Sequence, residues 1–280
     1  MDTQKKTELK KIACKIRMGV IEGTYNAKSG HPGGSLSIAD LMSYLYFVEM
    51  NVDVNNPQWD DRDRFVLSKG HTAPALYAAL AEKGFFSPEL IKTLRKPDSI
   101  LQGHPSMRYT PGVDMSTGSL GQGISTAVGM ALSGKLRNKD YRVYTILGDG
   151  EIEEGQVWEA AMLAGNKKLD NLVAVVDYNN LQIDGTLDEV NSPCPIDKKF
   201  EAFNWNVICI DGHSYEEIED AFCKAKECKG KPTCIVAKTI KGKGVSFMED
   251  QCGWHGTAPK EEQYNEAMSE LKKALAELEA

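Results

Sequence analysis

The chain has 280 residues, of which 41% are hydrophobic and 26% charged, proportions typical of a globular protein with a large buried core. Its 33 basic and 40 acidic side chains give a net charge of −7, which argues against a nucleic-acid partner and against an anionic membrane surface. No apolar run approaches the ~20 residues that span a bilayer, and residues 1–11 lack the apolar centre of a signal peptide.

Helices and short apolar strands alternate from residue 37 onward. Apolar residues at helical spacing predict a helix over 37–50, in which Ser37 and Asp40 would form a capping box at the start. The run 64–68 predicts a strand, and residues 72–84 predict a helix that ends at a glycine.

The middle of the chain begins with a glycine-rich stretch, GSLGQG at residues 118–123, which opens a helix crowded with glycine and alanine. Its backbone N–H groups could face an anion, but it lacks the GK[ST] ending of a P-loop, so we exclude an NTPase. The pattern then predicts a strand at 141–147, a helix at 153–169 and a strand at 171–178.

The last third repeats the alternation, with a strand at 205–211, a helix at 214–230, a strand at 233–239 and a helix at 260–280. Near-continuous apolar strands separated by helices imply a parallel sheet that is covered on both faces. We therefore expect an α/β fold, a doubly wound, mostly parallel sheet with helices on both faces, in a single domain over residues 1–280.

The seven cysteines are an odd number and include no C-x-x-C pair. Cys209 and Cys234 lie in apolar runs, so we expect most of the cysteines to be small buried residues. This usage indicates reduced thiols rather than disulfides or a zinc site, and therefore a cytoplasmic protein.

Two polar motifs directly follow neighbouring predicted strands. Asp149 lies in GDG after the strand at 141–147, and Asn179 lies in DYNN after the strand at 171–178, 30 positions later. Because ligands of open parallel sheets bind beyond the carboxyl ends of the strands, these two oxygen-bearing side chains predict a magnesium or calcium site beside a phosphate. The alternative, that both motifs are simple turns, stays open at this point.

All five histidines lie next to or one residue from a glycine: His31, His71, His104, His213 and His255. Histidines on glycine-rich loops are poor core residues and good candidates for proton transfer or contact with anions. For any single one of them, a turn histidine bonded to the backbone remains the alternative.

Five stretches, taken in this order, resemble transketolase: SGHPGGSLSIADLM, DRDRFVLSKGHTAPALYAAL, QGHPSMRYTPGVDMSTGSLGQG, GDGEIEEGQVWEA with DYNN, and GWHGTAP. They extend from Ser29 to Pro259. The GDG and NN pair alone indicates thiamine-diphosphate enzymes in general, whereas GHPGG and the long QGHP segment narrow the resemblance to transketolase. It implies the N-terminal, diphosphate-binding half, as found where the enzyme is split over two polypeptides.

The resemblance implies a cofactor, thiamine diphosphate, held through Mg²⁺, with Ca²⁺ or Mn²⁺ as alternative ions. Asp149, Asn179 and the main-chain carbonyl of Leu181 match the metal ligands of the family. Gly150 matches the glycine whose backbone meets the diphosphate.

Four of the histidines match catalytic positions of the family. His31 and His104 match histidines that contact substrate hydroxyls, and His71 and His255 match histidines near the diphosphate and the reacting carbon. His213 has no such counterpart, and we expect it to be structural.

Two further regions match residues around the cofactor. Ser119, Leu120 and Gly121 match a segment that touches it, and Glu154 matches an acid that organises the site at the subunit contact. The glutamate that activates the aminopyrimidine ring belongs to the other half of the family's chain. The resemblance thus implies a C-terminal transketolase subunit in trans, in a heterotetramer.

The implied activity is that of a transferase of the pentose phosphate pathway, which moves a two-carbon ketol unit between sugar phosphates. Two alternatives remain. The chain could be an α subunit of a 2-oxoacid dehydrogenase or resemble a 1-deoxyxylulose-phosphate synthase, against which GHPGG and QGHP argue. It could also be a non-catalytic scaffold subunit, against which the intact Asp149, Asn179 and histidine set argue.

Overall fold

The computed structural model describes residues 1–280, and its centre is one sheet of five parallel strands. The strands are β1 (Arg64–Leu67), β2 (Val143–Gly148), β3 (Leu172–Tyr178), β4 (Asn206–Asp211) and β5 (Thr233–Lys238), in the spatial order β1-β2-β3-β5-β4. Every neighbouring pair is parallel, so all five carboxyl ends lie at one edge of the sheet. The predicted α/β fold is confirmed.

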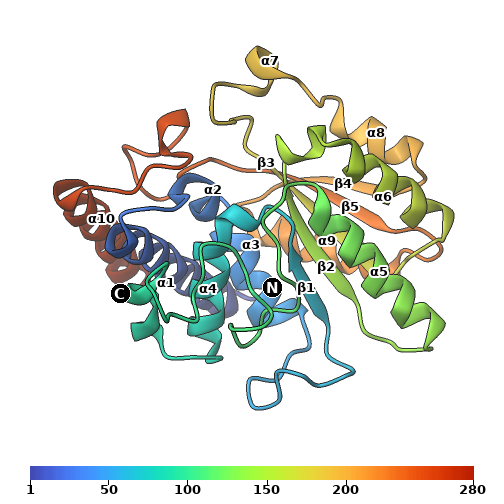
Figure 1. The fold of residues 1–280 in the computed structure, drawn as a ribbon, viewed down its shortest axis with the longest axis horizontal. Helices are drawn as coiled ribbons and strands as arrows, with labels where there is room; N and C mark the ends of the chain where they lie inside the picture. Colours follow the sequence, from blue (N-terminus) through green and yellow to red (C-terminus); the bar gives the residue numbers. More distant parts are fainter.

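Helices cover both faces of this sheet (Figure 1). The ten α-helices are α1 (Thr3–Ala27), α2 (Pro32–Leu36), α3 (Ala39–Tyr44), α4 (Ala73–Lys83), α5 (Gln122–Leu136), α6 (Gly155–Asn166), α7 (Leu187–Val190), α8 (Ile196–Ala202), α9 (Tyr215–Glu227) and α10 (Glu261–Glu279). Along β2, Tyr144 and Ile146 pack with α1, α3, α4 and α9, whereas Val143 and Leu147 pack with α5, α6 and α8. The strands therefore contribute alternate residues to two apolar layers.

The N-terminal region differs from the predicted pattern. The long helix α1 has no predicted counterpart, although it buries Leu9, Ile16 and Val20 against the core. Its five lysines, none of them buried, mask this apolar stripe in the sequence.

The helix predicted over 37–50 is confirmed for residues 39–49, where α3 continues into a π-helical turn over Leu45–Glu49, but its predicted capping box is wrong. Ser37 ends α2, and its hydroxyl donates to the Asp177 carboxylate at 2.8 Å, while Asp40 pairs with Arg17. Long-range polar contacts in the buried interior thus replace the local cap.

The C-terminal helix α10 packs on the body of the molecule. Met268 and Leu271 are buried, and Leu275 packs against the core. The ring of Tyr264 stacks on Tyr25 of α1 with 4.1 Å between the centroids. No helix of the chain combines the length and the apolar character that crossing a membrane requires.

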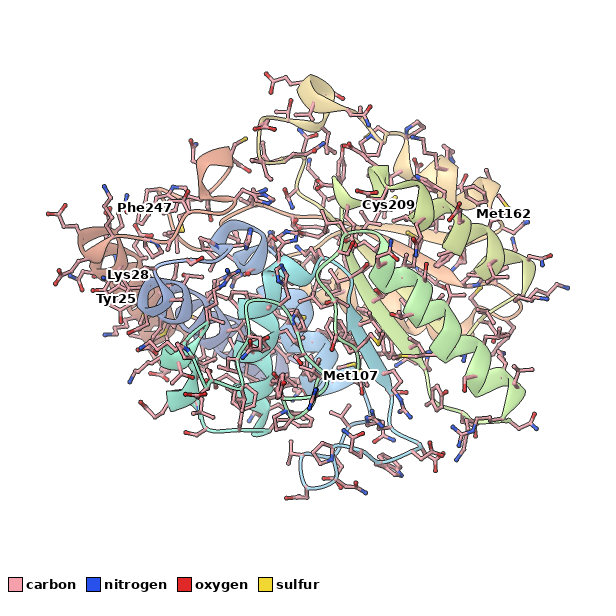
Figure 2. The ribbon with its side chains drawn as sticks, in the orientation of Figure 1. Tyr25, Lys28, Met107, Met162, Cys209 and Phe247 are labelled. Atoms are coloured by element: carbon pink, nitrogen blue, oxygen red, sulfur yellow. The ribbon has the colours of Figure 1, made fainter.

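The prediction that most cysteines are buried is wrong. All seven thiols are free, but only Cys14 and Cys234 are buried. Cys209, labelled in Figure 2, is exposed because it lies on β4, one of the two edge strands of the sheet. Residues of an edge strand are less completely buried than residues of a central strand. The apolar pattern of the sequence alone does not show which strand lies at an edge.

Candidate functional site

A cavity of about 320 Å³ lies beyond the carboxyl ends of β1, β2 and β3. Its lining includes most of the predicted site residues: His31, His71, His104, Leu120, Asp149, Gly150, Asn179, Leu181 and His255. A larger hollow of about 860 Å³ beside β4 and β5 contains none of the predicted site residues. The smaller cavity is therefore the candidate functional site.

The parallel pairing of β2 with β3 brings the two predicted metal ligands together. Gly148 is the register partner of Asp177, so Asp149 and Asn179 leave neighbouring strands at the same edge. The Asn180 N–H donates to one Asp149 oxygen at 2.6 Å, and the Gly150 N–H donates to the other at 2.9 Å. The two turns are thus bonded to each other.

Asp149 is a buried carboxyl group without an ion pair, since its oxygens accept only these two backbone N–H groups. Burial, with a further contribution from the nearby Asp177, raises the pKa of Asp149 to about 7. A cation at this carboxylate would remove the cost of burying its charge. The carboxylate, the Asn179 amide oxygen and the Leu181 carbonyl are the hard oxygen ligands that Mg²⁺ prefers, so the residues fit this ion.

No group of three or more histidine, cysteine or acidic side chains is arranged to hold a metal. An ion at Asp149 would therefore depend on amide and carbonyl oxygens and on oxygens that a ligand supplies. The Leu181 carbonyl presently accepts a hydrogen bond from Lys241 Nζ at 2.8 Å. Lys241 is itself buried, and this burial lowers its pKa to about 8.

The raised pKa of Asp149 predicts a pH-dependent difference in stability between the wild-type chain and Asp149→Asn. Because the pKa in the folded chain, about 7, lies above the usual 3.8, ionisation destabilises the fold increasingly as the pH rises from about 4 to about 7. Across this pH range, we expect the difference in free energy of unfolding between Asp149→Asn and the wild type to change by up to about 4 kcal/mol in favour of the variant. Urea unfolding in the presence of a chelator measures it, and a pH-independent difference would contradict the raised pKa.

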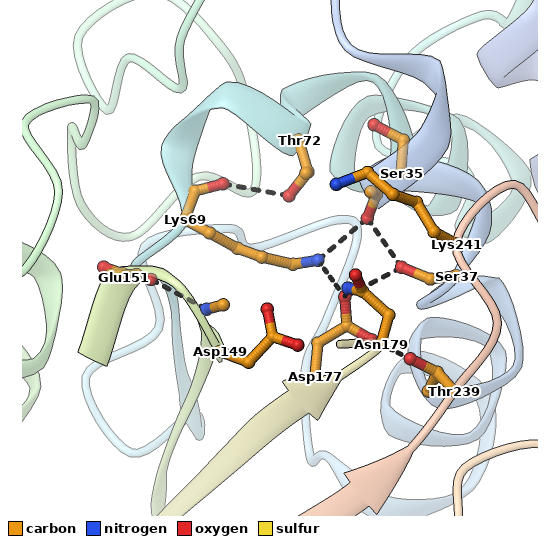
Figure 3. A network of polar contacts seen from close by, with 12 residues as sticks. Ser35, Ser37, Lys69, Thr72, Asp149, Glu151, Asp177, Asn179, Thr239 and Lys241 are labelled. Carbon is orange, nitrogen blue, oxygen red and sulfur yellow. Dashed lines mark hydrogen bonds and ion pairs between the residues drawn. The ribbon is translucent and has the colours of Figure 1, made fainter. Parts of the chain in front are cut away.

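A buried ion pair forms the floor of the site (Figure 3). Lys69 Nζ lies 2.6 Å from Asp177 Oδ2, with 2% and 0% of the two side chains exposed. The same carboxylate accepts hydrogen bonds from Ser37 and Thr239 and, at 2.9 Å, from the side-chain amide of Asn179. Burial opposes ionisation of Asp177, but Lys69 and these hydrogen bonds hold its pKa below its usual value.

This floor orients one of the predicted metal ligands. Because the Asn179 N–H₂ group donates to Asp177, the amide is held in one orientation, and its oxygen accepts from the Leu181 N–H at 3.2 Å. Sequence reasoning missed Lys69, Asp177 and Lys241 as parts of the site. The available signal was a charged residue at or just beyond the carboxyl end of a buried strand.

Three histidines meet above the floor. The ring centroids of His31, His71 and His255 lie 5.0 to 5.6 Å apart, and His104 lines the same cavity. Burial is the main cause that lowers the pKa of each: to about 4 for His31, to about 3 for His255, well below 6.5 for His71, and below it for His104. All four are therefore neutral at pH 7 and able to accept a proton.

The hydrogen bonds of these rings define one tautomer. His255 Nδ1 lies 2.9 Å from the Lys241 ammonium, which can only donate, so Nε2 of His255 carries the proton. His31 Nδ1 is buried and has no hydrogen-bond partner within the chain.

The remaining predicted residues lie around the cavity mouth. Leu120 is 38% exposed and lines the cavity, whereas Ser119, Gly121 and Glu154 do not line it. Gly121 has a φ of 77° at the start of α5, and its N–H donates to the buried Glu151 at 3.0 Å. Glu154 is exposed at the N-terminus of α6, and a side chain at Gly121 would collide with it.

Comparison with known proteins agrees with this geometry. Residues 8–275 match the family described as transketolase, thiamine diphosphate binding domain. The chain is 49% identical to the 6-deoxy-6-sulfo-D-fructose transketolase subunit SqwG of Clostridium sp. (strain MSTE9), over 97% of this chain and 98% of that one. It is 44% identical to an apulose-4-phosphate transketolase subunit from Phocaeicola vulgatus, over 95% and 94% of the two chains.

Longer relatives are matched over less than half of their length. Mouse transketolase is 47% identical, over 91% of this chain and 40% of its own. The crystal structure of transketolase from Campylobacter jejuni superposes with a TM-score of 0.90 at 33% identity, over 99% of this chain and 46% of that one. The chain therefore belongs to the transketolase family and corresponds to its thiamine-diphosphate-binding domain.

Proposed function

We propose that the chain is the cofactor-binding subunit of a thiamine-diphosphate- and Mg²⁺-dependent transketolase. The observation that carries the proposal is the position of Asp149 and Asn179 at neighbouring strand ends, beneath four neutral histidines in one cavity. The family match over residues 8–275 supports the cofactor, and the donor set supports the metal.

Each part of the cavity has a distinct role in this proposal. Asp149, Asn179 and the Leu181 carbonyl hold Mg²⁺, for which Ca²⁺ or Mn²⁺ can substitute. Gly150 lets the backbone approach the diphosphate because it has no side chain. A Cβ at this position would also lie 3.1 Å from the Gln182 side chain. Lys241 adds a positive charge at the same wall.

The bound cofactor supplies the carbanion and the electron sink, and the protein supplies position and protons. His31 and His104 contact substrate hydroxyls, while His71 and His255 lie near the diphosphate and the reacting carbon. Neutral imidazoles suit this role because both half-reactions need a base beside a hydroxyl that loses its proton. The overall reaction transfers a two-carbon ketol unit from a ketose phosphate to an aldose phosphate.

The proposal includes a second chain. Two relatives that this chain covers almost completely are named as transketolase subunits, whereas full-length transketolases are more than twice as long as the matched region. The ring-activating glutamate of the family belongs to the part that is not matched here. A C-terminal transketolase subunit would supply it in trans, in a heterotetramer to which this chain contributes a single domain over residues 1–280.

The test is ketol transfer from xylulose 5-phosphate to ribose 5-phosphate with Mg²⁺ and thiamine diphosphate. We expect a rate at least about 100-fold lower for this chain alone than for its mixture with the C-terminal subunit, because an essential acid–base group is missing. Equal rates with and without the partner would contradict the two-chain proposal. Release of CO₂ from pyruvate in place of ketol transfer would favour the 2-oxoacid dehydrogenase alternative.

A further inference from the structure

His213, the histidine without a counterpart at the active site, lies outside the cavity and connects two parts of the fold. It follows β4, and 14% of its side chain is exposed. Its Nδ1 lies 2.8 Å from Asp40 Oδ2, and its Nε2 accepts a hydrogen bond from the Ile240 N–H at 3.0 Å. Because a backbone N–H can only donate, Nε2 is unprotonated and Nδ1 carries the proton that Asp40 accepts.

The Asp40 end of this connection is rigid. The carboxylate is buried, and its Oδ2 also lies 2.5 Å from Arg17 Nη2, while the Tyr215 hydroxyl lies 3.3 Å from Oδ1. Burial opposes ionisation, but Arg17 and His213 hold the pKa of Asp40 well below its usual value. Helices α1, α3 and α9 thus fix one carboxylate, which in turn fixes the imidazole ring.

The Ile240 end lies in the segment that leads from β5 into the cavity wall. Three neighbours of Ile240 are bonded to the site: Thr239 donates to Asp177, Lys241 contacts Leu181 and His255, and the Gly242 N–H donates to the Gly33 carbonyl at 3.0 Å. His213 accepts the hydrogen bond of the Ile240 N–H, which lies between Thr239 and Lys241 where the chain enters the cavity wall.

We propose that His213 is a positioning residue that fixes the backbone at Ile240 and thereby directs Lys241 into the cofactor site. The Lys241 side chain is buried, so the place of its ammonium group depends on the backbone that carries it. The predicted effect of His213 on cofactor binding rests on the proposed function. Its predicted effect on the backbone of residues 239–242 does not.

Two amide variants separate the two hydrogen bonds of the imidazole. In His213→Gln the amide oxygen can take the place of Nε2 and accept from the Ile240 N–H, while the donor to Asp40 is lost. In His213→Asn the amide N–H₂ can take the place of Nδ1 and donate to Asp40, while the Ile240 N–H loses its acceptor. A positioning role predicts that Gln rescues and Asn does not, and a purely structural role through Asp40 predicts the reverse.

The experiment measures two properties of the full chain for the wild type and both variants. The first is amide hydrogen exchange of residues 239–242 without cofactor, which we expect to accelerate at least about 10-fold in His213→Asn and to stay near the wild-type rate in His213→Gln. The second is the Kd of thiamine diphosphate with Mg²⁺ for the chain assembled with the C-terminal subunit, which we expect to rise about 10- to 100-fold in His213→Asn only. Unchanged exchange in His213→Asn, or faster exchange in His213→Gln alone, would overturn the proposal.

A measurement on the wild-type chain keeps the proposal testable if a variant does not fold. The ¹⁵N chemical shifts of the His213 ring should show an unprotonated Nε2 and a protonated Nδ1 at neutral pH, and a protonated Nε2 would overturn the proposal. Failure of the proposed function has a different signature. In that case the wild-type chain would not bind thiamine diphosphate even with the C-terminal subunit, while residues 239–242 would still lose protection in His213→Asn.

Discussion

Replacing Asp149 with alanine is expected to weaken Mg²⁺-dependent binding of thiamine diphosphate by more than about 100-fold, since removing a group that only orients a metal ligand already costs 10- to 100-fold. Asp149 is the one carboxylate among the three proposed ligands, and it forms no ion pair with a lysine or arginine of the chain. Isothermal titration calorimetry of the variant assembled with the C-terminal subunit, with and without Mg²⁺, measures the loss.

The fold should survive this substitution, because Asp149→Ala removes a buried carboxyl group whose ionisation is unfavourable. Thermal unfolding without metal should therefore occur at or above the wild-type temperature. Asp188→Ala is the matched control, since Asp188 is an exposed acid on α7 and should leave cofactor affinity unchanged. Normal Mg²⁺-dependent binding by Asp149→Ala would show that the metal ligands have been assigned wrongly.

Replacing Lys69 with methionine is expected to lower the free energy of unfolding by about 3–5 kcal/mol, the usual cost of removing one partner from a buried ion pair. The variant leaves the Asp177 carboxylate fully buried without its counter-charge, with hydrogen bonds from Ser37, Thr239 and Asn179 remaining. Urea unfolding measures the change in free energy.

Two further variants identify the cause of this loss. The double variant Lys69→Met with Asp177→Asn should recover part of the stability, because no uncompensated charge remains. Lys92→Met breaks an exposed pair with Glu89 and should change the free energy of unfolding by less than about 1 kcal/mol. If Lys69→Met proved as mild as Lys92→Met, the buried pair would not stabilise the floor of the site.

The strands of the sheet could be predicted from the local pattern of apolar residues. The runs predicted at 171–178 and 233–239 correspond to β3 (Leu172–Tyr178) and β5 (Thr233–Lys238), because a strand buried on both faces is apolar at nearly every position. The helix predicted over 37–50 is likewise found, at residues 39–49, but its predicted capping box is wrong. Ser37 and Asp40 instead contact the distant residues Asp177 and Arg17, which no local pattern reveals.

Some contacts of the site could likewise be predicted from the sequence, whereas others could not. That Asp149 and Asn179 would meet follows from the order of the strands and from the common edge at which parallel strands end. That Lys69 would pair with Asp177, 108 positions away, or that Lys241 would contact Leu181 and His255, does not follow from any local pattern.

The α/β class, the places of the chemical motifs and the resemblance to transketolase follow from the amino-acid sequence, because apolar periodicity and motif spacing are properties of short stretches of chain. Which charged groups are buried and paired depends instead on how distant segments pack. Burial depends on segments from α1 to the loop after β5 packing together, and this packing makes the site histidines neutral, raises the pKa of Asp149 to about 7 and places His213 between Asp40 and Ile240.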